Sequence, residues 1–211
     1  MISYEAEQFV ESLDDIRKGY LSLVRKCEVY EAALEAADTW AVPDADLPDG
    51  SFHYIPYQLG NFADMILELA EYLPDDPDFK HSRQPVRPLT FVEVGCGIGR
   101  NLNIIRAQPL VPIAKAMGFD IVPQYIEVAR QLYGLGENVF VDDALTFDYG
   151  GFDLIFFYRP FSEGDLEKKF EEHLIDSAKS GAVIIGMSVE LLDNSRRVVE
   201  IGASGTLFKK L

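Results

Sequence analysis

The stretch F-V-E-V-G-C-G-I-G-R-N, residues 91–101, decides the fold class. An apolar run leads into three glycines at alternate positions, Gly95, Gly97 and Gly99, and a helical pattern begins at Arg100. Glycine lets the backbone turn sharply and leaves no Cβ where a ligand touches the main chain. In parallel α/β sheets a strand-to-helix turn of this kind lies at the carboxyl edge, where ligands bind. We therefore expect a strand, a ligand-binding loop and a helix in succession.

The residues around these glycines limit the kind of ligand. A dinucleotide loop, G-x-G-x-x-G, requires a glycine where Arg100 stands, and a phosphate-binding G-x-x-x-x-G-K-[ST] string is absent from the sequence. Glu93, two residues before the first glycine, would repel a pyrophosphate and attract a cation. The loop thus favours a positively charged ligand.

Apolar runs and helical patterns alternate after residue 88, which predicts a doubly wound, mostly parallel α/β sheet. Strands are expected at 89–94, 116–121, 138–141, 152–158 and 182–188, with helices at 100–108, 123–133 and 163–180. Only nine residues, 189–197, follow the fifth strand, too few for a parallel crossover. We therefore expect a C-terminal β-hairpin of residues 198–202 and 206–209, with a reduced or absent helix before it.

The first part of the chain is predicted to be helical. Apolar residues from Phe9 to Leu34 follow a heptad spacing, which indicates one long helix. This helix either packs on the rest of the chain or pairs with its copy in a homodimer. A second helix is expected at 57–72, and the proline-containing segment 74–88 is typical of a linker. We thus divide the chain into an N-terminal helical extension with its linker, 1–87, and a Rossmann-like domain, 88–211.

Composition narrows the classes of function. The 211 residues carry 19 basic and 35 acidic side chains, a net charge of −16, which disfavours nucleic acid as a partner. The sequence has no run of 18 apolar residues, and its acidic start differs from a signal peptide, so we expect a cytoplasmic protein with no membrane contact. Its two cysteines are expected to be free thiols, and its three scattered histidines predict no metal site.

The motif formed by Glu93, Gly95, Gly97 and Gly99 resembles the first motif of class I S-adenosylmethionine-dependent methyltransferases, [DE]-x-G-x-G-x-G. The resemblance covers residues 88–188, about half of the chain. It implies that S-adenosyl-L-methionine is the cofactor and that Glu93 lies beneath its amino-acid end. It also implies that Gly95, Cys96 and Gly97 form the loop behind the methionine and ribose.

Two further acidic positions support this resemblance. Asp120 ends the second strand about twenty residues after the loop, where a carboxylate can accept from both ribose hydroxyls. F-V-D-D-A, residues 140–144, is similar to the family's third motif, G-D-A, which implies that Asp143 and Ala144 meet the adenine and that Ile121 covers one of its faces. Each acid alone also fits a helix cap or a turn.

The end of the fourth strand is where the resemblance places the reacting groups. Family members that methylate exocyclic amines or amides carry [DN]-P-P-[FYW] there, whereas this chain has Tyr158, Arg159, Pro160 and Phe161. The missing Asn or Asp argues against methylation of nucleobases or glutamine. Tyr158 is a catalytic candidate that orients or deprotonates a nucleophile, and Arg159 is one that holds an anionic group. Their alternatives are packing for Tyr158 and a surface ion pair for Arg159.

The segment before the second helix, residues 53–61, supplies candidates that close the pocket on the substrate side. These are Tyr54, Tyr57 and Asn61, which Phe161 joins from the fourth strand. The tyrosines equally fit a role as anchors between helix and sheet. The leading hypothesis is a methyltransferase acting on a small molecule or a protein side chain. The alternatives are a non-catalytic scaffold that binds a partner protein through its N-terminal helix, and a nicotinamide-dependent oxidoreductase.

Overall fold

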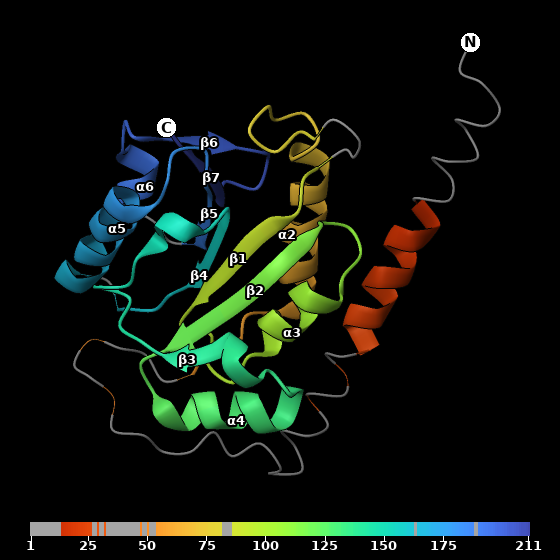
Figure 1. Cartoon of the computed structure of the whole chain (residues 1–211), viewed down its shortest axis with the longest axis horizontal. Coiled ribbons are helices and arrows are strands. Elements are labelled where there is room, and N and C mark those ends of the chain that lie inside the picture. Colours follow the sequence, from red (N-terminus) through yellow and green to blue (C-terminus); the bar gives the residue numbers. More distant parts are fainter. Residues whose placement is uncertain are drawn as a thin grey trace.

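The computed structural model describes residues 14–26, 29, 32, 47, 50, 54–81, 86–162, 164–187 and 190–211. In this described part, seven strands form one sheet in the order β3-β2-β1-β4-β5-β7-β6, and β7 runs antiparallel to both neighbours (Figure 1). The strands are β1 (Leu89–Val94), β2 (Ile113–Asp120), β3 (Val139–Val141), β4 (Leu154–Tyr158), β5 (Val183–Met187), β6 (Val198–Ile201) and β7 (Leu207–Lys210). The predicted doubly wound, mostly parallel sheet is confirmed.

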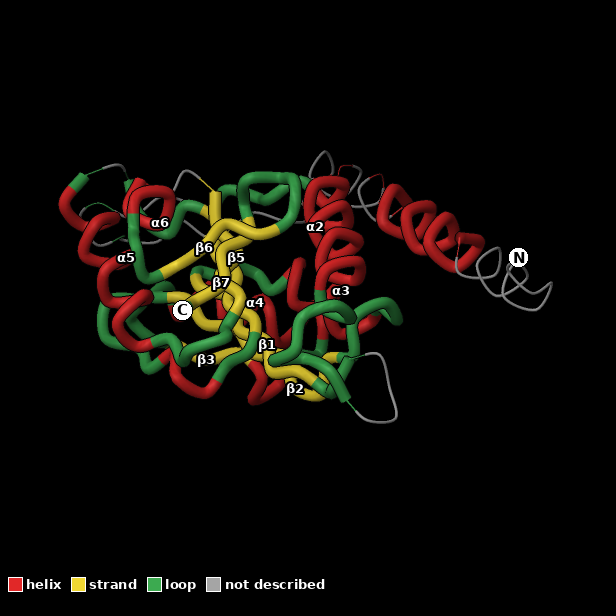
Figure 2. Tube along the Cα trace, turned by 90° about the horizontal axis from the view of Figure 1, so that it is seen from above, coloured by secondary structure: helices red, strands yellow, loops and turns green. Residues whose placement is uncertain are grey.

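Helices cover both faces of this sheet. They are α2 (Leu59–Tyr72), α3 (Arg100–Ala107), α4 (Pro123–Tyr133), α5 (Asp165–Ser177) and α6 (Glu190–Asn194), with 3₁₀ turns η1 (Gly136–Asn138) and η2 (Tyr149–Gly151). Apolar residues of α2, α3 and α4 share one core cluster with the sheet, and those of α5 share another. Figure 2 shows α2 and α3 on one side of the sheet and α5 and α6 on the other.

α2 belongs to the sheet's own helical layer. Its buried Phe62 and Ile66 lie in the same core as Phe91 of β1, because apolar positions recur at helical intervals on one face. The expected boundary after residue 87 therefore does not separate two cores. The segment between α2 and β1 differs from an open linker where it is described: Phe79 is buried, and Asp76 pairs with Lys209 of β7 at 2.7 Å.

The N-terminal helix is described over residues 14–26 and lies beside α2, farther from the sheet (Figures 1 and 2). Its Tyr20 and Val24 are buried in the core that α2 shares, whereas Ile16 and Leu23 of the heptad pattern are exposed. The other heptad positions, Phe9, Leu13, Cys27, Tyr30 and Leu34, lie outside the described residues. The homodimer therefore stays a prediction.

The C-terminal hairpin is confirmed, with β6 and β7 paired from Val198–Lys210 to Ile201–Leu207. The reduced helix before it is α6, of five residues. Glu68 of α2 fixes the hairpin turn, because its Oε1 accepts the backbone N–H groups of Ala203 and Ser204. None of the helices in the described ranges is both long and apolar enough to cross a membrane.

Candidate functional site

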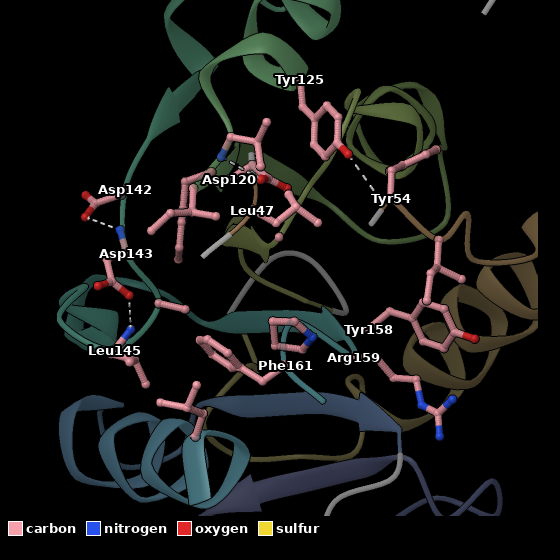
Figure 3. Close-up of a pocket in the computed structure, with 18 residues that line it drawn as sticks. Leu47, Tyr54, Asp120, Tyr125, Asp142, Asp143, Leu145, Tyr158, Arg159 and Phe161 are labelled. Atoms are coloured by element: carbon pink, nitrogen blue, oxygen red, sulfur yellow. Dashed lines mark hydrogen bonds between the residues drawn. The ribbon is translucent and has the colours of Figure 1, made fainter. Parts of the chain in front are cut away.

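A cavity of about 210 Å³ opens at the carboxyl edge of β1–β4 (Figure 3). Side chains from four strand ends, α4, α5 and the segment before α2 form its walls. The residues that line it are Leu47, Tyr54, Ile55, Gly95, Phe119, Asp120, Ile121, Val122, Tyr125, Asp142, Asp143, Ala144, Leu145, Tyr158, Arg159, Pro160, Phe161 and Leu166. Three carboxylates and several aromatic rings thus line one cavity.

The three glycines of the loop all have positive φ, and their surroundings differ. At Gly97 (φ 51°) an added Cβ would lie 2.3 Å from the Tyr54 ring, so this ring rests directly on the loop. At Gly99 (φ 80°) an added Cβ would lie 2.4 Å from a Leu135 methyl group and 3.0 Å from Ala129, so this glycine lets α3 approach α4. Gly97 therefore faces the segment that covers the cavity, whereas Gly99 has a packing role.

Glu93 is buried beneath this loop, 3% exposed. Its Oε1 accepts a 2.9 Å hydrogen bond from the Asn101 side-chain amide, while its Oε2 has no hydrogen-bond partner within the described part of the chain. Burial raises the pKa of Glu93 to about 8, which hydrogen bonds from Asn101 and Leu102 and the Arg100 charge oppose and the Asp120 charge reinforces. One oxygen of this carboxyl group thus lacks a partner among the described residues, and burial favours its protonated form.

Asp120 ends β2 and joins the loop to that strand. Its Oδ2 accepts the Gly97 N–H at 2.9 Å, and its Oδ1 accepts the Val122 N–H at 2.9 Å. Burial raises the pKa of Asp120, and the backbone N–H groups of Val122, Gly97 and Ile121 oppose that shift. The carboxylate thus fixes the loop while it lines the cavity.

The turn after β3 brings the predicted Asp143 and Ala144 to the cavity, together with Asp142, which was not predicted as a site residue. Asp143 accepts the Leu145 N–H at 2.9 Å, and Asp142 accepts the Asp143 N–H at 2.8 Å. Both carboxylates therefore shape the turn, and both also line the cavity with Ala144 and with the partly exposed Ile121. The turn role and a place beside a ligand are compatible here.

The two catalytic candidates flank the cavity without aiming their polar groups into it. Figure 3 shows the Tyr158 hydroxyl and the Arg159 guanidinium directed away from its centre. The Tyr158 ring packs against Tyr57, with centroids 4.7 Å apart. Arg159 has a φ of 46°, the one positive φ outside glycine among the described residues. A left-handed conformation in such a residue is strained, and strain of this kind concentrates at functional sites.

A strap, defined as the described residues Leu47, Gly50 and Tyr54–Tyr57, runs over the cavity. One anchor joins the Gly50 carbonyl to the Ser162 N–H at 2.9 Å, after β4. Another joins the Tyr54 N–H to the Tyr125 hydroxyl on α4 at 3.4 Å, and Arg100 of α3 donates to the Tyr57 carbonyl. The strap therefore connects the loop after β4 to the helices on the other side of the cavity.

The structure brings some of the predicted site residues together and leaves others apart. Tyr54 and Phe161 line the cavity, whereas Tyr57 is buried among Phe62, Phe156 and Tyr158. Asn61 is exposed on α2 and does not line the cavity. Cys96 is buried, and that burial raises its pKa, so the side chain stays a thiol.

Sequence analysis missed Phe119, Val122 and Asp142, which adjoin predicted residues, and also Leu47, Ile55, Tyr125, Leu145 and Leu166. The last five come from separate segments that meet only in the folded chain, so no spacing pattern connects them. Tyr125 had one available signal, its position in the first turn of the helix that follows Asp120.

Neither a family model nor a curated protein matches this sequence. Among solved structures, an RNA methyltransferase from Salinibacter ruber in complex with S-adenosyl-L-homocysteine is 17% identical, over 74% of this chain and 91% of that one, with a TM-score of 0.47. The Thermoplasma acidophilum 1320 protein is 20% identical over 66% of this chain and 67% of its own, with a TM-score of 0.46. The S-adenosylmethionine-dependent methyltransferase SibL is 24% identical over 61% of this chain, which spans 37% of SibL, with a TM-score of 0.37.

The topology of the chain itself identifies its fold. Five parallel strands in the order β3-β2-β1-β4-β5 are extended by an antiparallel β7 inserted before β6. The glycine loop follows the central strand β1, Asp120 ends β2, and Asp142 and Asp143 follow β3. This chain therefore has the class I methyltransferase fold.

Proposed function

We propose that the chain binds S-adenosyl-L-methionine in this cavity and transfers its methyl group to an acceptor. The observation that carries the proposal is the Glu93 carboxyl group, buried under the glycine loop with one oxygen lacking a hydrogen-bond partner among the described residues. Buried polar groups are nearly always satisfied, so an orphaned oxygen indicates a missing partner. An ammonium group next to a sulfonium supplies both the donor and the positive charge.

The other residues of the site fit the remaining parts of this cofactor. Asp120 lies at the end of β2, where it would accept from ribose hydroxyls. Asp143, Ala144 and the partly exposed Ile121 form one end of the cavity, suited to a flat base with an amino group. The Gly95–Gly97 backbone would support the amino-acid part, and Asn101 would assist Glu93 there.

The position of the Tyr54 ring on the glycine loop affects how a ligand can bind. Because its ring rests on Gly97, a ligand group that contacts the Gly97 backbone must displace or restack this ring. Tyr54 meets α4 through a 3.4 Å hydrogen bond from its backbone N–H to the Tyr125 hydroxyl and through an edge contact between the two rings, whose centroids are 6.0 Å apart. Tyr54 would then cover the bound ligand and exclude water.

The bound cofactor supplies an activated methyl group, and the protein's task is alignment and the exclusion of water. Asp120 and the glycine loop, joined by the 2.9 Å bond from Gly97, would fix one reactant. Pro160 packs near Gly95, where an added Cβ would lie 3.7 Å from its ring, and so closes the space between β1 and β4. The acceptor would be held against this wall.

Calorimetry with S-adenosyl-L-methionine and S-adenosyl-L-homocysteine tests the proposal. We expect both to bind the intact chain, and we expect Gly97→Arg or Asp120→Ala to weaken binding at least tenfold. Gly19→Ala and Asp176→Ala are matched controls on exposed helical positions away from the cavity, and their binding should equal that of the wild type. Absence of binding by the intact chain would exclude the proposal.

One observation supports the alternative that the chain is a non-catalytic scaffold for a partner protein. Ile16, Leu23 and Val29 are large apolar side chains exposed on the N-terminal helical segment, with Val29 72% exposed. An apolar surface of this kind suits a partner protein. Tight cofactor binding without any methyl transfer to a cell extract would favour this alternative over the enzyme.

A further inference from the structure

Tyr149 begins the 3₁₀ turn η2, five residues after Ala144 of the cavity wall. Its side chain is fully buried, and its hydroxyl donates a 2.9 Å hydrogen bond to the Ala144 carbonyl. Burial raises the pKa of Tyr149, and the charges of Asp143 and Asp142 raise it further, so the hydroxyl keeps the proton that it donates. Tyr149 is not among the described residues that line the cavity, so any effect on a ligand passes through the backbone that it holds.

The Tyr149 ring is itself fixed by α5. It lies edge-on to the rings of Phe170 and His173, with centroids 6.5 Å and 5.8 Å away. His173 Nε2 also lies 2.8 Å from the Phe147 carbonyl, at the end of the turn that follows β3. This helix therefore supports the turn at two points, and a binding group on a supported turn keeps a more precise direction than one on a free loop.

The peptide unit between Ala144 and Leu145 is held at both ends. Its carbonyl accepts from Tyr149, and its N–H, that of Leu145, donates to the Asp143 carboxylate at 2.9 Å (Figure 3). The preceding unit, between Asp143 and Ala144, is held through its carbonyl, which accepts two backbone N–H groups of the same turn at 3.0 Å each. Because the C=O and N–H of a trans peptide point in opposite directions, these bonds also fix the direction of the Ala144 N–H.

The Ala144 N–H is a donor that this turn leaves unused, since it has no acceptor among the described residues. The N–H groups on either side of it, those of Asp143 and Leu145, both donate to aspartate side chains. Ala144 is 8% exposed and lines the cavity together with Asp143. Because buried N–H groups nearly always have a partner, this wall offers a ligand one donor and a neighbouring carboxylate acceptor.

We propose, resting on the cofactor binding proposed above, that Tyr149 is a positioning residue that aims the Ala144 N–H at a ring nitrogen of the cofactor's adenine. The adenine edge presents a ring nitrogen that accepts beside an amino group that donates, which matches the Ala144 N–H beside the Asp143 carboxylate. Hypoxanthine carries an N–H and a carbonyl at the same two places, so it would set donor against donor and acceptor against carboxylate. The turn is thereby ready to select adenine before any ligand arrives.

Calorimetry with S-adenosyl-L-homocysteine and its hypoxanthine analogue, S-inosyl-L-homocysteine, measures this selection. We expect the intact chain to bind the adenine compound at least about tenfold more tightly, because hypoxanthine leaves a buried donor unpaired. In Tyr149→Phe, which loses only the hydroxyl, we expect this ratio to fall about fivefold or more, through weaker binding of the adenine compound. A loss of stability alone would not change the ratio, so the ratio separates a positioning role from a merely structural one.

Tyr72→Phe is the matched control. It removes a hydroxyl that donates to Asp76, which pairs with Lys209 of β7 away from the cavity, and it should keep the wild-type ratio. Equal binding of the two compounds by the intact chain, or a wild-type ratio in Tyr149→Phe, overturns the inference. Absence of S-adenosyl-L-homocysteine binding by the intact chain would instead overturn the proposed function, and this inference with it.

Amide hydrogen exchange of the ligand-free chain gives a readout that needs no cofactor. The Leu145 N–H belongs to the peptide unit whose carbonyl Tyr149 holds. We expect its exchange to be faster in Tyr149→Phe and unchanged in Tyr72→Phe. Wild-type exchange at Leu145 in both variants would show that Tyr149 does not position the turn.

Discussion

One 2.9 Å hydrogen bond joins the Asn101 side-chain amide to the Glu93 carboxyl group, and each residue keeps a buried oxygen with no partner in the described chain. A half-satisfied pair in a buried site is destabilising on its own. Both residues are more than nine-tenths buried, Glu93 in β1 and Asn101 in the first turn of α3. Two buried oxygens beneath the glycine loop, Glu93 Oε2 and Asn101 Oδ1, thus have no hydrogen-bond partner among the described residues.

Glu93→Gln should change the pH dependence of stability. Burial raises the pKa of Glu93 from its ordinary value of 4.5 to about 8, so the folded chain holds this proton more tightly than the unfolded chain does. Stability from this group is therefore lost as pH rises from about 4.5 to about 8, by on the order of 1.4 kcal/mol per pKa unit.

Urea unfolding at pH 5.5 and pH 8 measures the effect. The wild type should lose more free energy of unfolding between these two values than Glu93→Gln, by an amount on the order of 1 kcal/mol or more. The same difference in both proteins would mean that Glu93 is ionised throughout this range.

Gly97→Ala should mainly weaken cofactor binding, whereas Gly99→Ala should mainly lower stability. At Gly97 (φ 51°) the new methyl group meets the Tyr54 ring, a side chain that can move, so we expect weakened cofactor binding and a loss of stability of about 1 kcal/mol from the left-handed backbone alone. At Gly99 (φ 80°) the same backbone strain adds to a clash with Leu135 and Ala129 in the core, so we expect a larger loss of about 2–4 kcal/mol. Thermal unfolding and calorimetry on both variants check this, and an equal loss of stability in the two would contradict the assignment.

Asp153→Ala should destabilise the sheet at the edge where β4 begins, opposite the cavity. The buried Asp153 carboxylate accepts from Arg87 at 2.7 Å, from Lys179 at 2.6 Å and from the Thr90 N–H at 2.8 Å. Hydrogen bonds from these groups lower the pKa of Asp153 despite burial, so its contribution is present near neutral pH and is lost as pH falls into the acid range.

We expect Asp153→Ala to cost about 2–4 kcal/mol at pH 7, since both cations are partly solvated. Asp176→Ala, which removes an exposed pair with Arg197, is the matched control and should cost at most about 1 kcal/mol. A denaturant series at pH 7 distinguishes them, and equal costs would show that burial adds nothing to this network.

Glu68→Ala should loosen the C-terminal hairpin. Glu68 is the acceptor for two backbone N–H groups in the turn between β6 and β7, and its loss leaves them to water. We expect a cost of about 1 kcal/mol and faster amide hydrogen exchange at Ala203 and Ser204. Glu71→Ala, on the same helix, is the control and should leave exchange at these amides unchanged. Unchanged exchange in Glu68→Ala as well would show that Glu68 does not hold the turn.

The positions of the parallel strands in the sequence could be predicted because these strands are continuous apolar runs between turn residues. β1 (Leu89–Val94) and α4 (Pro123–Tyr133) have the predicted bounds, the latter because Pro123 marks a first helical turn. β2 begins earlier than expected, at Ile113, since its first residues include exposed positions such as Lys115 that break the apolar run.

The place of the segment before β1 could not be predicted. Prolines around Phe79 are typical of a linker, yet this ring is buried and Asp76 meets Lys209 through a contact 133 residues apart in sequence. The residues of the candidate site likewise fall into two groups, those that sequence motifs predict and those that only the folded chain brings together. Glu93 and Asp120 follow from motif spacing, whereas Tyr125 and Ile55 reach the cavity only through the strap and α4.

The central claim is that Glu93 receives the ammonium group of S-adenosyl-L-methionine. Calorimetry at pH 6.5 in two buffers of different ionisation enthalpy measures the protons released on binding S-adenosyl-L-homocysteine, which carries the same ammonium. The account predicts binding with release of close to one proton by the wild type, because the burial-raised pKa of Glu93 keeps it protonated beforehand, and little release by Glu93→Gln. Absence of binding, or equal proton release by both proteins, would contradict it.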